Sequence, residues 1–269
     1  MEPISPPPGP KADVFVFGVP FWNPTYAEFK SWWDQTLEGE EPVKVLQLAN
    51  ANTLNIAWSD PGYKRVLQAA ECCVNDGVGF RIAAKMRGVE TKYNFNGTDL
   101  MPRLFAEARR EVRVFFYGAT EEINRLAVEK LCAKYPNVVN AGRVNGFVDP
   151  EKEAVPMIRE AAPDVLLVAL GQPRQELFMQ RHRDLPVKVA VSCGGLFDFL
   201  SETKSRAPLL MRKIGTEWLY RLVIEPRRMF VRYVVGNPLF LWRAMVTRGS
   251  DLRCAEESSA ARPSTEAQS

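Results

Sequence analysis

Short apolar runs alternate with amphipathic segments from Asp13 to about Leu200. Runs rich in Val, Ile, Leu and Phe predict strands, and apolar residues spaced three or four apart predict helices. The predicted strands are Asp13–Phe17, Val43–Leu48, Cys72–Val74, Val112–Tyr117, Val138–Ala141, Val165–Leu170 and Val187–Ser192. The predicted helices are Tyr26–Leu37, Gly62–Ala69, Val78–Met86, Asp99–Arg109, Glu121–Lys134, Glu151–Ala161 and Arg174–His182. This alternation predicts an α/β fold with a mostly parallel sheet, which binds ligands beyond the carboxyl ends of its strands.

The pattern becomes helical from Pro208 onward, and Pro226 and Pro238 are expected to divide it into short helices. Between Lys204 and Arg253 the chain has eleven Lys and Arg residues and three acidic residues. This segment therefore carries a net charge of +8, and the rest of the chain carries −5. A basic end on a mildly acidic body indicates a polyanionic partner, such as anionic lipid, phosphate or nucleic acid.

Composition narrows the class of protein further. The five cysteines are scattered and odd in number, which favours free thiols in a reducing compartment. The Pro-rich start does not resemble a signal peptide, and no stretch approaches the roughly 20 apolar residues of a membrane span. We therefore expect a cytosolic protein. His182 is the single histidine, so a zinc site built on several histidines is excluded and general-base chemistry falls to a carboxylate.

Asp76 is the strongest candidate for that carboxylate. It lies in the segment Asn75–Gly79, which follows a predicted strand and opens a predicted helix. An acid there sits at the binding edge of the sheet, and the neighbouring glycines allow a ligand to approach the backbone. The alternative is that Asp76 only caps the helix.

Polar residues follow two other predicted strands. Thr53 and Asn55 come after Val43–Leu48, where they would bind a sugar hydroxyl or phosphate, or serve as turn and capping residues. Gln175 lies in Gly171–Glu176, where a strand end meets a helix N-terminus, an arrangement that suits an anion or a sugar. The alternative there is a plain strand–helix turn.

Four arginines of the basic segment lie in the run from Glu217 to Tyr233, among Trp, Phe and Tyr residues: Arg221, Arg227, Arg228 and Arg232. Guanidinium groups bind phosphate in bidentate fashion, so these residues would clamp a pyrophosphate. The alternative is a solvated basic face. No nucleic-acid-binding motif accompanies the charge, and neither GxGxxG nor a Walker A motif is present. These absences disfavour nucleic-acid, dinucleotide and NTPase functions.

In their order and spacing, these segments resemble the WecG/TagA/CpsF glycosyltransferase family, also called glycosyltransferase family 26, over about Val14 to Leu241. The segments that carry the resemblance are Thr53–Asn55, Asn75–Gly79, Gly97–Asp99, Gly171–Glu176, Gly194–Phe199, Arg206–Pro208, Glu217–Leu222, Glu225–Arg228 and Gly236–Pro238. One departure is that the stretch from Thr53 to Asp76 is a few residues shorter than the family pattern, a change that would affect donor or acceptor choice.

The resemblance implies an inverting, metal-independent and cofactor-free transfer of a hexose-type sugar in bacterial cell-surface or exopolysaccharide synthesis. The sugar would be glucose, N-acetylmannosamine or its uronic acid, and it would pass from a UDP-sugar to a polyprenyl-pyrophosphate-linked saccharide. A Rossmann-like core would bear a C-terminal appendage that meets the inner face of the cell membrane and completes the site. The resemblance makes Asp76 the catalytic base, puts Thr53, Asn55 and Gln175 in the substrate pocket, and gives diphosphate binding to Arg221 and Arg228, with Arg227 and Arg232 as further candidates.

We accordingly expect a disordered start (1–12), a catalytic core (13–203), a basic membrane-associating appendage (204–253) and a disordered tail (254–269). A chain cut after about Thr203 would then be soluble but inactive. Two other classes stay open from the residues alone: a nucleotide-cofactor oxidoreductase, and a non-catalytic module that binds membranes or nucleic acid. The sequence leaves the donor sugar, the acceptor sugar, the linkage and homo-oligomer formation undecided.

Overall fold

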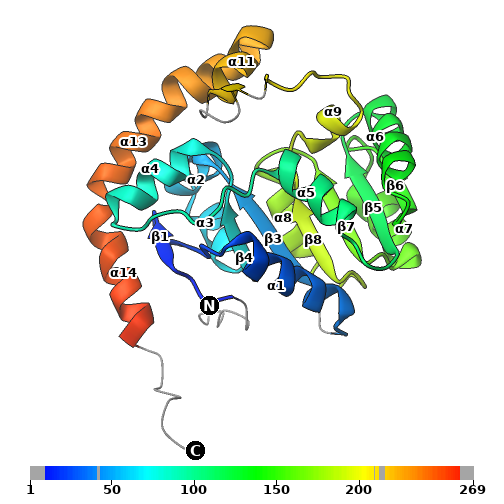
Figure 1. Cartoon of the computed structure of the whole chain (residues 1–269), viewed down its shortest axis with the longest axis horizontal. Helices are drawn as coiled ribbons and strands as arrows, with labels where there is room; N and C mark the ends of the chain where they lie inside the picture. The colour runs from blue at the N-terminus through cyan, green and yellow to red at the C-terminus, as the bar shows by residue number, and fades with distance from the viewer. Residues whose placement is uncertain (1–9, 41–42, 209, 212–215, 261–269) are drawn as a thin grey trace, which may run out of the picture.

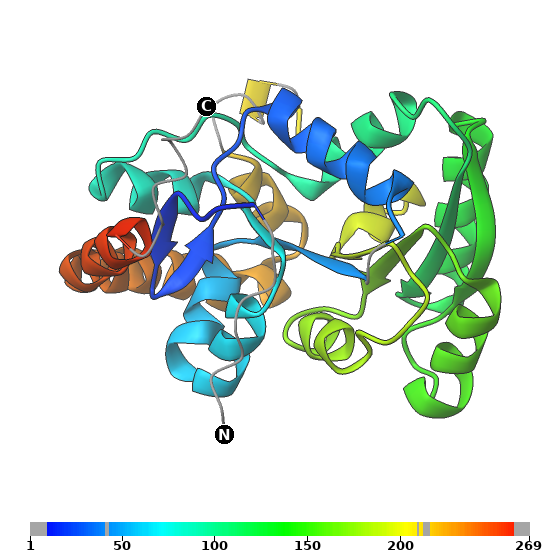
Figure 2. The same cartoon turned by 90° about the horizontal axis from the view of Figure 1, so that it is seen from below.

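A six-stranded parallel sheet organises the chain, in the order β4-β3-β8-β7-β5-β6 (Figure 1, Figure 2). The computed structural model describes residues 10–40, 43–208, 210–211 and 216–260. In chain order the strands of this sheet are β3 (Lys44–Ala49), β4 (Cys72–Asn75), β5 (Val112–Gly118), β6 (Val138–Val144), β7 (Val165–Ala169) and β8 (Val189–Ser192). The predicted α/β fold is confirmed.

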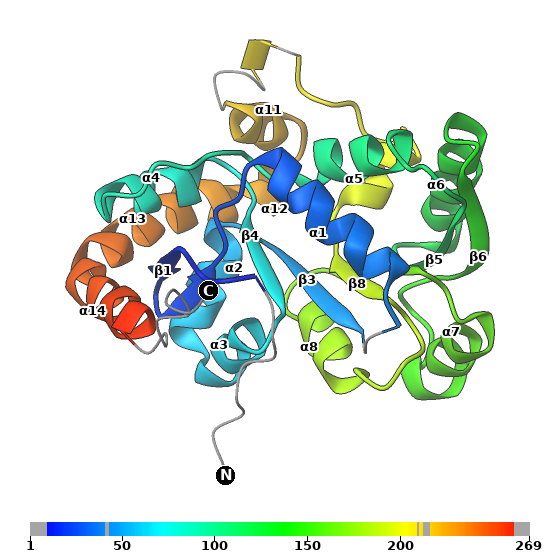
Figure 3. The same ribbon diagram turned by 60° about the horizontal axis from the view of Figure 1, so that its bottom comes forward.

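Helices cover both faces of the sheet (Figure 3). One face carries α1 (Tyr26–Glu38), α5 (Gly97–Ala106), α6 (Glu121–Lys134) and α9 (Leu196–Leu200), whose apolar side chains form one core with the strands. The other carries η1 (Pro150–Ala154), α7 (Val155–Ala161) and α8 (Arg174–Arg181), which close a second core around Phe178. Strands buried on both faces need apolar residues at successive positions, which explains the unbroken apolar runs of the sequence.

The first predicted strand lies outside this sheet. Val14–Val16 (β1) pairs antiparallel with Val19–Phe21 (β2), a strand that the sequence analysis did not predict. The turn between them places Phe17 and Gly18 at φ 58° and 75°. Two successive residues with positive φ make the tight turn that suits a two-residue hairpin. The chain therefore reverses after three residues instead of entering the parallel sheet.

Three helices pack near this hairpin: α2 (Ala51–Ser59), α3 (Pro61–Gln68) and α4 (Val78–Met86). No helix was predicted over Thr53–Asn55, where a turn or capping role was the alternative to ligand binding, but these residues lie in α2. Asn50 caps α2 directly after β3, because its side chain accepts hydrogen bonds from the backbone N–H groups of Asn52 and Thr53. A strand followed at once by a capped helix left no loop signal to mark the boundary.

The C-terminal appendage is a chain of helices that runs as an arc along the outer side of α4 and the hairpin (Figure 1). It comprises α11 (Glu217–Ile224), α12 (Pro226–Phe230), η2 (Val231–Val235), α13 (Gly236–Val246) and α14 (Arg248–Ala260). The chain breaks before Pro226 as predicted, whereas Pro238 lies in the first turn of α13, where proline needs no hydrogen-bond partner. The last helix continues to Ala260, past Cys254, where the sequence predicted a disordered tail to begin; residues 1–9 and 261–269 lie outside the described residues.

Asp251 in α14 fixes the far end of the appendage to the hairpin. Its carboxylate accepts hydrogen bonds from the backbone N–H groups of Phe17 (3.1 Å) and Gly18 (2.8 Å). It also pairs with Arg87 after α4, whose Nε lies 3.0 Å away, and both side chains are almost fully buried. Arg87 in turn donates to the carbonyl of Ala244 (3.2 Å) and the hydroxyl of Thr247 (3.1 Å). We call Arg87, Asp251 and the hairpin turn the C-terminal clamp.

Candidate active site

The carboxyl ends of five parallel strands open into a cleft of about 900 Å³. The cleft is lined by residues that follow β3, β4, β5, β7 and β8, and the appendage closes its far wall. The polar side chains in this lining are Asn50, Asn52, Asp76, Asn94, Asn96, Thr98, Thr120, Gln172, Gln175, Ser192, Asp198, Lys204, Glu217, Arg221, Arg232, Tyr233 and Asn237. The cleft lies where parallel α/β sheets bind ligands.

Asp76 lies at the end of β4 with its side chain half-buried in the cleft wall. Its backbone N–H donates to the carbonyl of Ala49 (2.9 Å), and one carboxylate oxygen accepts from the Asn50 amide (3.4 Å). The alternative that Asp76 merely caps a helix is wrong, because Gly77 occupies the N-cap position of α4 and no side chain caps that helix. The carboxylate therefore has no capping role.

The two glycines beside Asp76 have different tasks. Gly77 has φ +97°, a conformation that favours glycine, and a Cβ there would meet open space, so a ligand can approach this backbone. Gly79 does not serve ligand approach, because a Cβ on it would lie 3.1 Å from Ala51 Cβ and 3.5 Å from the Phe240 ring. Gly79 thus lets α4, α2 and α13 pack closely, which the sequence analysis did not foresee.

The appendage arginines act on Asp76 across the cleft. Burial raises the pKa of the Asp76 carboxyl, while the Asn50 hydrogen bond and the charges of Arg221 and Arg232 oppose this rise without cancelling it. The fold therefore brings Asp76 to one site with Arg221 and Arg232, which lie more than 140 positions later in the chain. A carboxyl with a raised pKa binds a proton more readily, which suits a general base.

Arg221 is held firmly in the cleft. Its guanidinium is 3.1 Å from Glu217 and lies over the Phe199 ring at 4.6 Å. Burial disfavours its charge, yet the nearby Tyr233, Glu217 and Asp76 together raise the pKa of Arg221. Its Nε–H is buried and has no hydrogen-bond partner among the described residues. One donor of this fixed cation is therefore available to a substrate oxygen.

The other predicted arginines are placed differently. Arg232 lines the cleft, with its guanidinium 5.6 Å from the Tyr233 ring. Arg227 is exposed on α12, and the described lining of the cleft does not include it. Arg228 belongs to the same helix, but its side chain lies outside the described residues.

Thr53 and Asn55 lie behind the cleft wall. The Thr53 hydroxyl accepts from the backbone N–H of Asn50 (3.1 Å) and from the side chain of Gln172 (2.6 Å). Asn55 donates to the carbonyl of Gly236 (2.8 Å) and accepts from Arg243 (3.0 Å). Thr53 thus supports Gln172, while Asn55 holds α13 against α2; substrate contact by either residue stays a prediction.

Gln175 lines the cleft but is almost fully buried and fixed at both ends of its amide. Its Nε2 donates to Glu176 (2.8 Å), and its Oε1 accepts from the backbone N–H of Gly194 (3.2 Å). It therefore ties α8 to the loop after β8. Gln172, whose side chain bridges Thr53 and Asn52, belongs to the predicted segment Gly171–Glu176 but was not named there as a site residue. Asn50 was not predicted, although it directly follows β3, which is the signal that pointed to Asp76.

The buried carboxyl of Glu176, which accepts a hydrogen bond from Gln175, should make the stability of the protein depend on pH. Burial raises the pKa of Glu176 from 4.5 to about 7, because the ionised carboxylate is poorly solvated there. In the unfolded chain the group ionises near its ordinary value, so its contribution to stability is complete below about pH 4.5 and is lost as pH rises to about 7. Glu176→Gln should remove about 2–3 kcal/mol of that pH dependence, measured by urea unfolding at pH 5 and pH 7.5. The exposed Glu122→Gln serves as control; equal pH slopes in all three proteins would contradict this interpretation.

Comparison with known proteins gives the class. The family model described as Glycosyl transferase WecG/TagA/CpsF family matches residues 14–253. Three curated relatives are named N-acetylglucosaminyldiphosphoundecaprenol N-acetyl-beta-D-mannosaminyltransferase. The one from Bacillus spizizenii is 36% identical over 174 residues, covering 64% of this chain and 68% of the relative. The relative from Bacillus subtilis is 29% identical, over 79% of this chain and 84% of the relative. The relative from Staphylococcus aureus strain MRSA252 is 30% identical, over 86% of this chain and 92% of the relative. With its cleft, its appendage and these relatives, the chain belongs to the WecG/TagA/CpsF glycosyltransferase family.

Proposed function

We propose that this glycosyltransferase moves a hexose-type sugar from a UDP-sugar to a polyprenyl-diphosphate-linked saccharide, with Asp76 as the general base. The observation that carries the proposal is that Asp76 and two appendage arginines face one cleft at the carboxyl edge of the sheet. The names of the relatives describe N-acetylmannosaminyl transfer to N-acetylglucosaminyl-diphosphoundecaprenol, so N-acetylmannosamine is the favoured donor sugar ahead of glucose or the uronic acid.

The chemistry follows from the charges that develop during transfer. The acceptor hydroxyl loses a proton as it attacks the anomeric carbon, and Asp76 would accept that proton on the face opposite the leaving group. The departing diphosphate gains negative charge, which Arg221 would neutralise from the appendage. A guanidinium held in place before the reaction costs little reorganisation when the charge appears. Attack opposite the leaving group inverts the anomeric configuration.

A peripheral position on the inner membrane surface is part of the proposal. Exposed apolar side chains gather on α11, α12, η2 and α13, and they include Trp218, Val223, Ile224, Phe230, Val231, Val235, Trp242, Met245 and Val246. Interspersed arginines would attract anionic headgroups while the apolar side chains enter the interface. Among the described helices, none combines the length and the apolar character needed to cross a bilayer.

The direct test is release of UDP by the purified protein. We would supply UDP-N-acetylmannosamine, its uronic acid, UDP-glucose and UDP-N-acetylglucosamine in turn, each with an N-acetylglucosaminyl-diphosphate lipid and with EDTA present. Release that depends on the acceptor and on one donor would support the proposal and its metal independence. A folded protein that releases UDP from no donor would contradict it.

The variant Arg221→Ala tests whether the appendage contributes to catalysis. Loss of this fixed cation should lower kcat/KM by roughly 100-fold, the usual effect of removing one preorganised donor to a developing charge. The matched control is Arg248→Ala, which removes the same charge from an exposed position on α14, away from the cleft lining. Equal activity losses in the two variants would show that Arg221 contributes only to the overall basic charge.

A further inference from the structure

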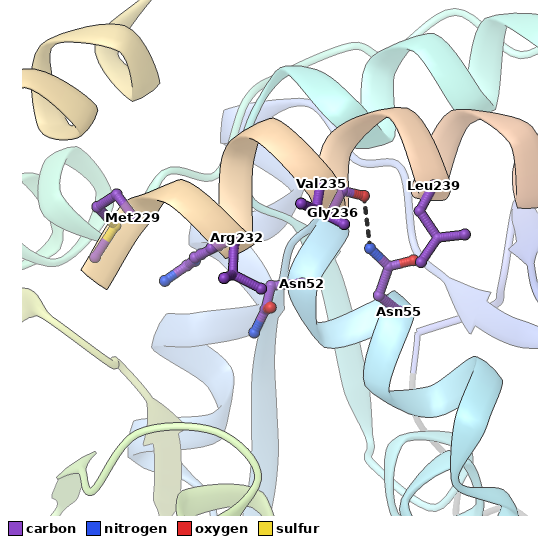
Figure 4. Close-up of a pocket in the computed structure, with 8 residues that line it drawn as sticks. Asn52, Asn55, Met229, Arg232, Val235, Gly236 and Leu239 are labelled. Carbon is purple, nitrogen blue, oxygen red and sulfur yellow. Dashed lines mark hydrogen bonds between the residues drawn. The ribbon is translucent and has the colours of Figure 1, made fainter. Parts of the chain in front are cut away.

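A second, smaller pocket of about 400 Å³ lies between α2 and the appendage (Figure 4). Asn52 and Asn55 of α2 form one side of it, and the appendage residues Met229, Val231, Arg232, Val235, Gly236 and Leu239 form the other. Its volume falls within the roughly 300–1,000 Å³ of small-molecule sites. No part of the mechanism above uses it.

The polar side chains of this pocket are largely engaged within the protein. The Asn52 amide donates to Gln172 (2.7 Å), and Asn55 bonds to Gly236 and Arg243, as Figure 4 shows for Gly236. What remains for a ligand is mainly the apolar surface of Met229, Val231, Val235 and Leu239. A nucleotide base or a free sugar would lose its hydrogen bonds to water here without replacement, so the lining favours a hydrocarbon.

The small pocket adjoins the cleft through two shared residues. Asn52 and Arg232 line both spaces. Arg232 therefore stands at the junction between a polar cleft that contains Asp76 and an apolar pocket. A ligand that spans this junction needs a polar sugar, then an anion beside the guanidinium, then a hydrocarbon chain.

We propose that the small pocket holds the first isoprenoid units of the lipid acceptor, with the acceptor diphosphate at Arg232 and the acceptor sugar in the cleft towards Asp76. This inference rests on the proposed function, and it adds the place where the hydrocarbon is bound. The outer lining supports the assignment, because Val231 and Val235 are 67% and 51% exposed and continue into the exposed apolar side chains of α13. A chain longer than the pocket would pass over these residues towards the membrane.

The experiment compares two acceptors that share one N-acetylglucosaminyl-diphosphate head. One carries a long prenyl chain in detergent micelles, and the other, the short acceptor, carries only a methyl group in place of the prenyl chain. For the parent protein we expect a higher kcat/KM with the long chain. In Leu239→Asn, kcat/KM for the long acceptor should fall by about ten-fold, because a hydrocarbon contact becomes polar, while the short acceptor is unaffected.

Two further variants make the result decisive. Val235→Asn changes a half-exposed lining residue, so folding is little affected and the same loss of chain-length preference is expected. Met157→Asn removes an exposed apolar side chain from α7, away from both the pocket and the appendage, and should keep the parent ratio of kcat/KM between the long and the short acceptor. The proposal is overturned if the pocket variants keep the parent ratio or if Met157→Asn lowers it equally. A parent protein that transfers sugar to neither acceptor would refute the proposed function and this inference with it.

Discussion

Asp76→Asn is expected to reduce sugar transfer by about 10²–10⁴-fold, since a positioned general base contributes this much to a reaction. The amide keeps the shape of the side chain and can still meet Asn50, so the cleft should stay intact. We expect UDP binding, measured by calorimetry, to be nearly unchanged. The loss should therefore appear in kcat and leave KM for the donor close to the parent value.

The same variant should be at least as stable as the parent near neutral pH. Burial raises the pKa of Asp76, so the folded state holds its proton to a higher pH than the unfolded chain does. The stability that this proton provides is complete below the unfolded pKa and is lost as pH rises through the folded pKa. Asp76→Asn has no such loss, and its Tm should rise relative to the parent as pH increases over that range. Near-normal turnover would remove Asp76 as the base, whereas a lower Tm at neutral pH would show that its charge is stabilised in the fold.

Asp251→Ala should destabilise the protein by about 3–5 kcal/mol, measured by urea unfolding. The variant leaves the Arg87 guanidinium buried without its carboxylate, and breaking a buried pair from one side costs this much. It also removes the acceptor for the backbone N–H groups of Phe17 and Gly18.

The control for Asp251→Ala is Glu129→Ala. Glu129 pairs with Arg125 on the surface of α6 at 2.7 Å, and loss of an exposed pair of this kind costs roughly 0–1 kcal/mol. A double variant, Arg87→Met with Asp251→Leu, separates charge from packing, because replacing both partners by apolar residues recovers much of the loss. If Asp251→Ala were no more destabilising than Glu129→Ala, the C-terminal clamp would not hold the appendage.

The packing of the appendage against the rest of the fold changes the expected result of removing it. From the sequence, a chain cut after about Thr203 is predicted to be soluble but inactive. Phe240 and Ala244 of α13, however, are fully buried against the hairpin and α4, in the same core as Phe17 and Phe80. We therefore expect the truncated chain to expose this core and aggregate, and point variants such as Arg221→Ala give the cleaner test of the appendage.

The helices could be predicted where the spacing of apolar residues and the residues at the helix start determine the structure. The helices Val78–Met86 and Glu121–Lys134 have their predicted bounds, since each segment carries an apolar stripe and Thr120 caps the start of the second. Asp76 was a candidate because it follows a buried strand at the edge where parallel sheets bind ligands, and in the fold it lines the cleft at that edge. These inferences need only neighbouring residues.

Long-range contacts could not be predicted in this way. Arg87 and Asp251 lie 164 positions apart, and each alone resembles a surface charge. Likewise, nothing near Asn55 in the sequence indicates that it holds Gly236, and Gly79 gave no sign that Phe240 packs against it. The partners of such residues are set by the tertiary fold.

The bond between Phe17 and Asp251 has a consequence for synthesis in the cell. It joins positions 234 residues apart, so the first strand pair acquires its final partner only when the last helix has been made. At translation rates of about 5–20 residues per second, the delay is roughly 10–50 s. During that interval the backbone N–H groups of Phe17 and Gly18 have no native acceptor, and Phe17 lacks the Phe240 ring that packs against it in the folded chain.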